Sequence, residues 1–211
     1  MNNGIIFDLD GTLWDSSQNV VKSWNEVLEK RTGKTITPQD MQGYMGKTLE
    51  KIGELMLPDI PSDLRSDIMK ECCSNENKYL KVHGGVLFPN LEKVLGELSE
   101  KYKLFIVSNC QSGYIEVFLE YTGFGKYFAD FECPGGTGKE KGDNIRIVVE
   151  RNSLDKAVYI GDTQGDCDSA DYAGVPFIHA AYGFGTINRE VPKVNSLSEI
   201  GEAVREFFLT D

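Results

Sequence analysis

The sequence lacks several features that mark common classes of protein. No apolar run approaches the ~18 residues that a membrane-spanning helix needs, and residues 1–4 carry no basic segment typical of a signal peptide. The five cysteines form no Cys-x-x-Cys pair, and neither of the two histidines lies near a cysteine. We therefore expect a cytoplasmic protein with reduced thiols, without membrane spans and without a cysteine–histidine zinc site.

Positive charge is also scarce. The chain has 22 lysines and arginines against 33 aspartates and glutamates, which gives a net charge of -11. Such a chain repels nucleic acid and anionic membranes, so neither is expected as a partner. A small anionic substrate would need a cation or a focused basic group in order to bind.

Two glycine-rich segments fall short of nucleotide-binding patterns. Residues 135–139 resemble a phosphate-binding loop, but Cys133 and Glu140 stand where that pattern needs glycine and serine or threonine. Residues 183–185 lack the third glycine of a dinucleotide fingerprint. Neither segment predicts a nucleotide site.

What the chain does contain is a series of short, continuous apolar runs. They predict strands over residues 4–7, 104–107, 128–131, 157–160 and 175–178. The third is the weakest and is expected nearer an edge. Helical spacing of apolar residues recurs at 89–100, 111–121, 144–151 and after Ser196. Continuous runs that alternate with helices predict an α/β fold with a doubly wound, Rossmann-like parallel sheet.

Residues 16–84 break this alternation. They hold no convincing strand, and their apolar spacing predicts helices that end near Gly33, begin at Pro38 and run from Ser62. The segment is too long for a crossover between neighbouring strands. We therefore predict an inserted helical cap domain at residues 16–84 and a catalytic core at residues 1–15 and 85–211.

Polar residues follow several of the predicted strands. Residues 8–13 (Asp-Leu-Asp-Gly-Thr-Leu) follow the first, Ser108 and Asn109 the second, and residues 161–166 (Gly-Asp-Thr-Gln-Gly-Asp) the fourth. Lys139 and Lys141 precede the helix after the third. Ligands bind at the carboxyl ends of parallel strands, so these side chains are expected in one crevice.

The residue types in this crevice suit phosphoryl transfer. One carboxylate can attack phosphorus, and a second can protonate the leaving oxygen and then activate water. A hard cation such as Mg²⁺ binds through a few carboxylates and keeps several waters. A lysine and a hydroxyl can hold phosphoryl oxygens as negative charge develops.

The motifs resemble those of haloacid dehalogenase-like phosphatases, closest to the phosphoglycolate phosphatase-like branch. Residues 8–13 with Asp15 match the first motif, residues 107–109 the second, and residues 161–174 the fourth. The third motif is the loosest, because the usual Lys-Pro is absent. Lys141 is favoured as the lysine of the third motif, because the residues after it then begin a helix as the residues after the motif lysine do in the family. Lys139 is the alternative.

The resemblance implies a Mg²⁺-dependent phosphoric monoester hydrolase that acts on a small phosphorylated metabolite through an aspartyl-phosphate. Asp8 would be the nucleophile and Asp10 the general acid/base, with Thr12 steadying Asp10. Phosphate would be bound by Ser108, Asn109 and Lys141. The metal ligands would be Asp8, the Asp10 backbone carbonyl, Asp162 and Asp166. Lys47, in the cap, is a candidate contact to a second anionic group of the substrate.

Other readings use the same residues. A phosphosugar mutase would keep the aspartate pair and exclude water, although mutases usually carry a bulky apolar residue where Thr12 stands. Phosphonate hydrolysis would need a cap lysine, for which Lys22 or Lys47 is available. A phosphate-binding, receiver-like module would be about half this length and would lack a cap. The sequence predicts neither the substrate nor the oligomeric state.

Overall fold

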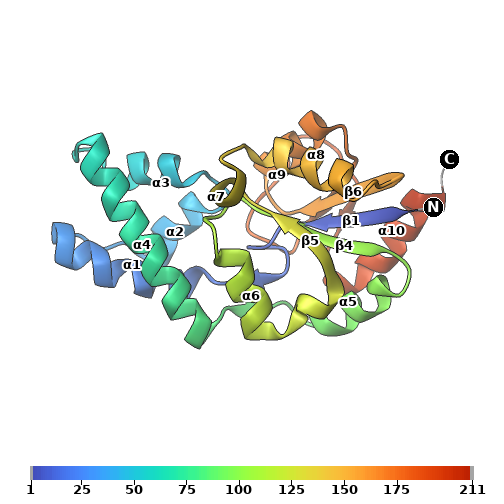
Figure 1. Cartoon of the computed structure of the whole chain (residues 1–211), viewed down its shortest axis with the longest axis horizontal. Helices are drawn as coiled ribbons and strands as arrows, with labels where there is room; N and C mark the ends of the chain where they lie inside the picture. Colours follow the sequence, from blue (N-terminus) through green and yellow to red (C-terminus); the bar gives the residue numbers. More distant parts are fainter. Residues whose placement is uncertain (1, 210–211) are drawn as a thin grey trace.

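The computed structural model describes residues 2–209, and at its centre is a six-stranded parallel sheet (Figure 1). Its strand order is β5-β4-β1-β6-β7-β8, which places β1 between β4 and β6. The strands are β1 (Asn3–Phe7), β4 (Lys103–Val107), β5 (Phe128–Glu132), β6 (Lys156–Gly161), β7 (Phe177–Ala180) and β8 (Lys193–Val194). The predicted α/β class is confirmed, and β5 is an edge strand as expected.

Helices cover both faces of the sheet, which explains the continuous apolar runs. Ile5 and Phe7 of β1 pack into one buried cluster and Ile6 into the other, because successive side chains of a strand point to opposite faces. The first cluster is covered by α5 (Leu91–Ser99), α6 (Tyr114–Thr122) and α10 (Ile200–Leu209). The second is covered by α8 (Lys141–Arg151) and α9 (Gln164–Ala173).

Four helices form a separate unit at one end of the sheet (Figure 1). They are α1 (Ser17–Thr32), α2 (Pro38–Tyr44), α3 (Leu49–Met56) and α4 (Ser62–His83). We call them the cap. Gly33 ends α1 in the left-handed conformation at φ 69°, and a reciprocal Thr37–Asp40 capping box starts α2. The expected helical cap is confirmed.

A short antiparallel ladder joins the cap to the core. Strands β2 (Trp14–Asp15) and β3 (Val86–Leu87) pair on the two connections to the cap. Two-residue strands leave no periodic signal, so neither was predicted. They lie next to the predicted boundaries at 15/16 and 84/85, and these boundaries stay a prediction.

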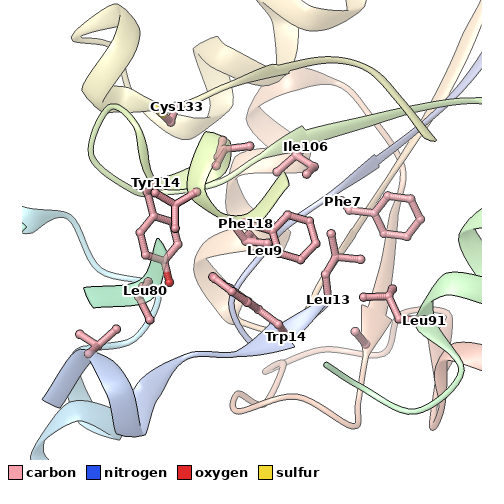
Figure 2. Packing of buried hydrophobic residues seen from close by; sticks show 14 of the residues in the cluster. Phe7, Leu9, Leu13, Trp14, Leu80, Leu91, Ile106, Tyr114, Phe118 and Cys133 are labelled. Atoms are coloured by element: carbon pink, nitrogen blue, oxygen red, sulfur yellow. The ribbon is translucent and has the colours of Figure 1, made fainter. Parts of the chain in front are cut away.

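The loop after β1 rests on an aromatic cluster, shown in Figure 2. Trp14 meets Phe118 edge-on with ring centroids 5.0 Å apart, and it meets Tyr114 at 6.0 Å. Leu9 and Leu13 are fully buried in the same cluster. The residues that flank Asp10 are therefore fixed against α6 by packing.

Other differences from the predicted elements are local. Strand β7 begins at Phe177, because Val175 donates its N–H to Ala170 O at the end of α9 and Pro176 has no N–H for the sheet. The short elements η1 (Phe124–Tyr127), α7 (Pro134–Thr137) and η2 (Leu197–Glu199) were not predicted. None of the helices between residues 2 and 209 has the length and apolarity needed to cross a membrane.

Candidate active site

The first two carboxylates lie on a tight loop at the end of β1. The Asp8 N–H donates to Ile160 O at 2.8 Å, which extends the pairing of β1 with β6 by one residue. The chain then turns, and Leu13 donates to Leu9 O at 2.9 Å. Gly11 lies at φ 85°, and a Cβ there would be 2.3 Å from Asp162 Oδ2. Glycine at this position therefore lets the loop approach the loop after β6.

Lys141 reaches the end of β1 from the start of α8. Thr137 Oγ1 donates to Asn144 Oδ1 at 2.6 Å, and Asn144 Nδ2 donates to Lys139 O at 3.1 Å, so the approach to α8 is tied down. Lys141 Nζ then lies 2.8 Å from Asp8 Oδ1 and 2.5 Å from Asp166 Oδ1. Lys139 is exposed. Of the two candidate lysines, Lys141 is therefore the one that meets the carboxylates.

Asp166 is held by the first turn of α9. Its Oδ2 accepts from Thr163 N at 2.9 Å, from Thr163 Oγ1 at 2.7 Å and from Asp162 N at 3.2 Å. Burial opposes ionisation of this carboxyl. The Lys141 ammonium and the Thr163 donors outweigh that effect and hold the pKa of Asp166 below its usual range.

Asp8, Asp162 and Asp166 form a buried carboxylate cluster. One oxygen of each lies within 4.8 Å of the others. Burial is the main cause that raises the pKa of Asp8 to about 7 and that of Asp162 to about 8, and neighbouring carboxylates add to both shifts. Asp162 Oδ2 accepts from Phe184 N at 2.7 Å, whereas Oδ1 is buried without a hydrogen-bond partner among residues 2–209.

This cluster fits a hard divalent cation. Lys141 supplies one positive charge to three carboxylates, so the cluster carries surplus negative charge when ionised. Carboxylate oxygens are preferred ligands of Mg²⁺, and the unpartnered Oδ1 of Asp162 is free to serve as one. The predicted side-chain ligands thus lie together.

Asp10 lies outside this cluster and has different partners. Its Oδ1 accepts from Ser16 Oγ and from Tyr114 OH, both at 2.7 Å. Burial raises the pKa of Asp10 to about 6, and the two hydroxyls partly oppose that shift. Thr12 was expected to steady Asp10, but its hydroxyl is buried without a hydrogen-bond partner in the described part of the chain. Ser16 and Tyr114 make that contact instead.

Core and cap enclose a cavity of about 300 Å³ in front of these residues. Asp8, Asp10, Ser108, Asn109 and Lys141 line its core side. Ser108 is buried, and Asn109 Nδ2 donates to Gly46 O of the cap at 3.2 Å. The cap side is lined by Val20, Trp24, Met41, Tyr44, Met45, Gly46, Lys47, Thr48, Leu49, Ile52 and Glu76. Lys47 is part of this lining and is exposed to solvent.

Sequence reasoning missed Glu76, a buried acid of the cap. It lies on the face of α4 that buries Met69, Cys72, Cys73 and Leu80. A glutamate that continues an apolar i, i+3, i+4 stripe was the signal that could have found it. Trp24 Nε1 donates to Glu76 Oε2 at 2.5 Å.

Comparisons with known proteins agree with this geometry. A family model described as haloacid dehalogenase-like hydrolase matches residues 5–180. Phosphoglycolate phosphatase of Aquifex aeolicus is 26% identical over 195 residues, which cover 89% of each chain. The phosphoglycolate phosphatase of Vibrio parahaemolyticus is 26% identical over 217 aligned positions, which cover 95% of each chain.

Solved structures share the fold. A haloacid dehalogenase-like family hydrolase from Streptococcus pneumoniae superposes with a TM-score of 0.83 at 22% identity. The match covers 96% of this chain and 98% of that one. The likeness therefore includes the cap as well as the sheet.

Proposed function

The chain belongs to the haloacid dehalogenase-like hydrolase family and is a phosphatase, and on that basis we propose how it works. We propose that it hydrolyses a small phosphomonoester with Mg²⁺, through an aspartyl-phosphate on Asp8. The observation that carries the proposal is the cluster of Asp8, Asp162, Asp166 and Lys141, of which Asp8 and Lys141 line the cavity together with Asp10.

Asp8 is the proposed nucleophile. A carboxylate oxygen of Asp8 forms a bond to phosphorus as the bond from phosphorus to the leaving oxygen breaks. Lys141 and the Ser108–Asn109 segment line the same part of the cavity and offer donors to the phosphoryl oxygens. These donors stabilise the negative charge that develops in the transition state.

Asp10 is the proposed general acid and base. Its raised pKa lets it carry a proton near neutral pH, and it gives this proton to the leaving oxygen. Asp10 then takes a proton from the water that attacks the aspartyl-phosphate. The second attack breaks the bond between Asp8 and phosphorus, releases phosphate and returns both aspartates to their starting states. Ser16 and Tyr114 keep the Asp10 carboxyl oriented through both steps.

Four groups would hold the metal: the side chains of Asp8, Asp162 and Asp166, and the backbone carbonyl of Asp10. When bound, Mg²⁺ offsets the charge of the carboxylates and of the incoming phosphoryl group. Without a cation, burial and mutual repulsion favour protonation of Asp8 and Asp162. The raised pKa values of these two groups support a site that depends on a cation.

The cap is proposed to close over the substrate and read its leaving group. The contact between Asn109 Nδ2 and Gly46 O supports this, because it ties the cap loop to the phosphate-binding segment. Lys47 follows Gly46, lines the cavity and is exposed. It is the proposed contact for a second anionic group of a substrate.

The test is phosphate release from an aryl phosphate, with Mg²⁺ and with a chelator. We expect turnover that stops on chelation and returns when Mg²⁺ is restored. A phosphate-binding module without hydrolytic activity would take up one phosphate per protein molecule. It would not release phosphate over repeated turnovers. Turnover that is indifferent to chelation would contradict the proposed role of the carboxylate cluster.

A further inference from the structure

Glu76 is a buried acid on the wall of the cavity that the proposed mechanism does not use. It lies on α4 of the cap and is 4% exposed. Trp24 Nε1 donates to its Oε2. Among residues 2–209, no lysine or arginine forms an ion pair with Glu76.

The surroundings of Glu76 do not compensate a charge. The groups that act on it are the Trp24 indole and the Gln111 amide, which favour ionisation, and Asp10, which opposes it. Burial dominates these effects and raises the pKa of Glu76 to about 8. Tyr114, Cys72 and Cys73 are further titratable neighbours, and Tyr114 donates its hydroxyl hydrogen to Asp10. A buried acid in such surroundings costs free energy of folding unless another group forms a hydrogen bond or an ion pair with it.

Packing does not require an acid at this position. The neighbouring positions of the same helix face hold Met69, Cys72, Cys73 and Leu80, so an apolar side chain would suit the stripe. The cap side of the cavity that Glu76 shares is lined mostly by apolar residues such as Val20, Met41 and Ile52. Glu76 is thus a buried acid with which the cap can meet a ligand inside the cavity.

We propose that Glu76 is a specificity-determining residue that accepts a hydrogen bond from a hydroxyl or ammonium group on the leaving group. It disfavours a carboxylate in the same place. The inference rests on the proposed phosphatase function and adds a class of substrate to it: phosphate esters of small alcohols that carry a hydrogen-bond donor near the ester.

A ligand in the cavity can give the Glu76 carboxyl a further hydrogen-bond partner. A donor from the ligand forms a hydrogen bond with the Glu76 carboxyl, whereas a carboxylate brings no hydrogen to it and opposes the ionisation of both Glu76 and Asp10. Phosphoglycolate, named in the relatives, ends in such a carboxylate. A site built to pair with a donor disfavours a ligand that lacks one, because the Glu76 carboxyl then keeps only its partners within the protein, Trp24 and Gln111.

The experiment uses four esters of nearly equal size. They are 2-hydroxyethyl phosphate, 2-aminoethyl phosphate, phosphoglycolate and ethyl phosphate, which has no donor. We expect kcat/KM of the wild-type protein for the two donor esters to exceed that for phosphoglycolate by about tenfold or more. Comparison of the hydroxyl and ammonium esters then identifies the donor.

The variant is Glu76→Gln, which keeps the size of the side chain and an acceptor for Trp24. The ratio of kcat/KM for the donor esters to that for phosphoglycolate should fall about tenfold, with a larger loss for the ammonium ester. A ratio is independent of how much protein is folded. Glu50→Gln, at an exposed glutamate of the cap, is the matched control and should leave all ratios unchanged.

The outcomes separate the two claims. Hydrolysis of all four esters with the same ratios in wild type and Glu76→Gln would overturn the inference and leave the phosphatase function standing. Preference of the wild-type protein for phosphoglycolate would overturn it as well. No hydrolysis of any ester, an aryl phosphate included, would overturn the proposed function and the inference together.

Discussion

The two sides of the cavity are built differently. The core side is lined by Asp8, Asp10 and the buried Lys141, and behind them one oxygen each of Asp8, Asp162 and Asp166 lies within 4.8 Å of the others. The cap side is mostly apolar, with one buried acid and one exposed lysine. We propose that the core carries out the reaction and that the cap selects the leaving group.

The residues on the two sides of the cavity are also held in place by different interactions. Asp8 and Asp162 follow strands of one sheet, so backbone pairing sets their distance. Trp24 and Glu76 come from α1 and α4, whose relative position depends on side-chain packing. A site held by a sheet can keep its geometry while the facing helices change, which suits one chemistry with several substrates.

The largest effect is expected at Asp8. Asp8→Asn removes the proposed nucleophile, so kcat should fall by at least about a thousandfold in steady-state phosphate release. The fold should persist, because a buried carboxyl is replaced by an amide of the same shape. Asp168→Asn changes an exposed acid of α9 and should keep full activity. Turnover retained by Asp8→Asn would move the chemistry away from the core carboxylates.

Asp10→Asn should have the next largest effect. Loss of a general acid costs on the order of 10²–10⁴-fold, and the cost should be greater for an alkyl ester than for an aryl ester whose leaving oxygen needs no proton. The measurement is kcat/KM for both esters in the same preparation. Equal losses would show that Asp10 supports the loop rather than proton transfer.

Much of the core was predictable because its signals are local. The apolar runs of β1, β4 and β6 and the polar residues after them lie in short stretches, and a parallel sheet brings such ends together. Lys141 was favoured over Lys139 from the sequence, but its contacts with Asp8 and Asp166 needed the structure. Tyr114 could not be predicted, because 104 residues separate it from its partner Asp10.

The sequence predicted the helices of the cap but not which of their residues face the cavity. Its helices follow from apolar spacing, whereas the residues that face the cavity depend on how four helices pack. Glu76 shows the limit: its place in an apolar stripe was visible in the sequence, but its contact with Trp24, 52 residues away, was not.

A smaller effect, on stability, tests the burial of Glu76. Its pKa is about 8 in the folded protein and near 4.5 ordinarily, so between these values the native state binds more protons than the unfolded state. The contribution of Glu76 to stability is therefore full below about pH 4.5 and is lost as pH rises towards 8. A glutamine side chain does not titrate, so Glu76→Gln does not lose stability in this way as pH rises.

Denaturant unfolding at pH 5 and pH 8 measures the difference. The free energy of unfolding of Glu76→Gln, relative to wild type, should rise by about 1–3 kcal/mol between these two values. Asp8 and Asp162 also titrate in this range, but they are common to both proteins and cancel. A constant difference would mean that Glu76 is well paired, and the contrast between the two sides of the cavity would weaken.

The smallest effect is expected at Lys47. Lys47→Ala should raise KM a fewfold, about 2–5-fold, for an ester with a second anionic group, because an exposed charge is screened by solvent. KM for a neutral aryl phosphate should not change. Equal changes in both values would remove Lys47 from substrate recognition and leave Glu76 as the cap residue that selects.

The most direct test of the account is to trap the covalent intermediate. The protein is mixed with Mg²⁺ and an aryl phosphate, quenched in acid during turnover and digested for mass spectrometry. A phosphoryl adduct on the peptide that contains Asp8, absent from Asp8→Asn, is the predicted result. Phosphate release without any adduct at Asp8, in wild type and in Asp8→Asn alike, would contradict the account.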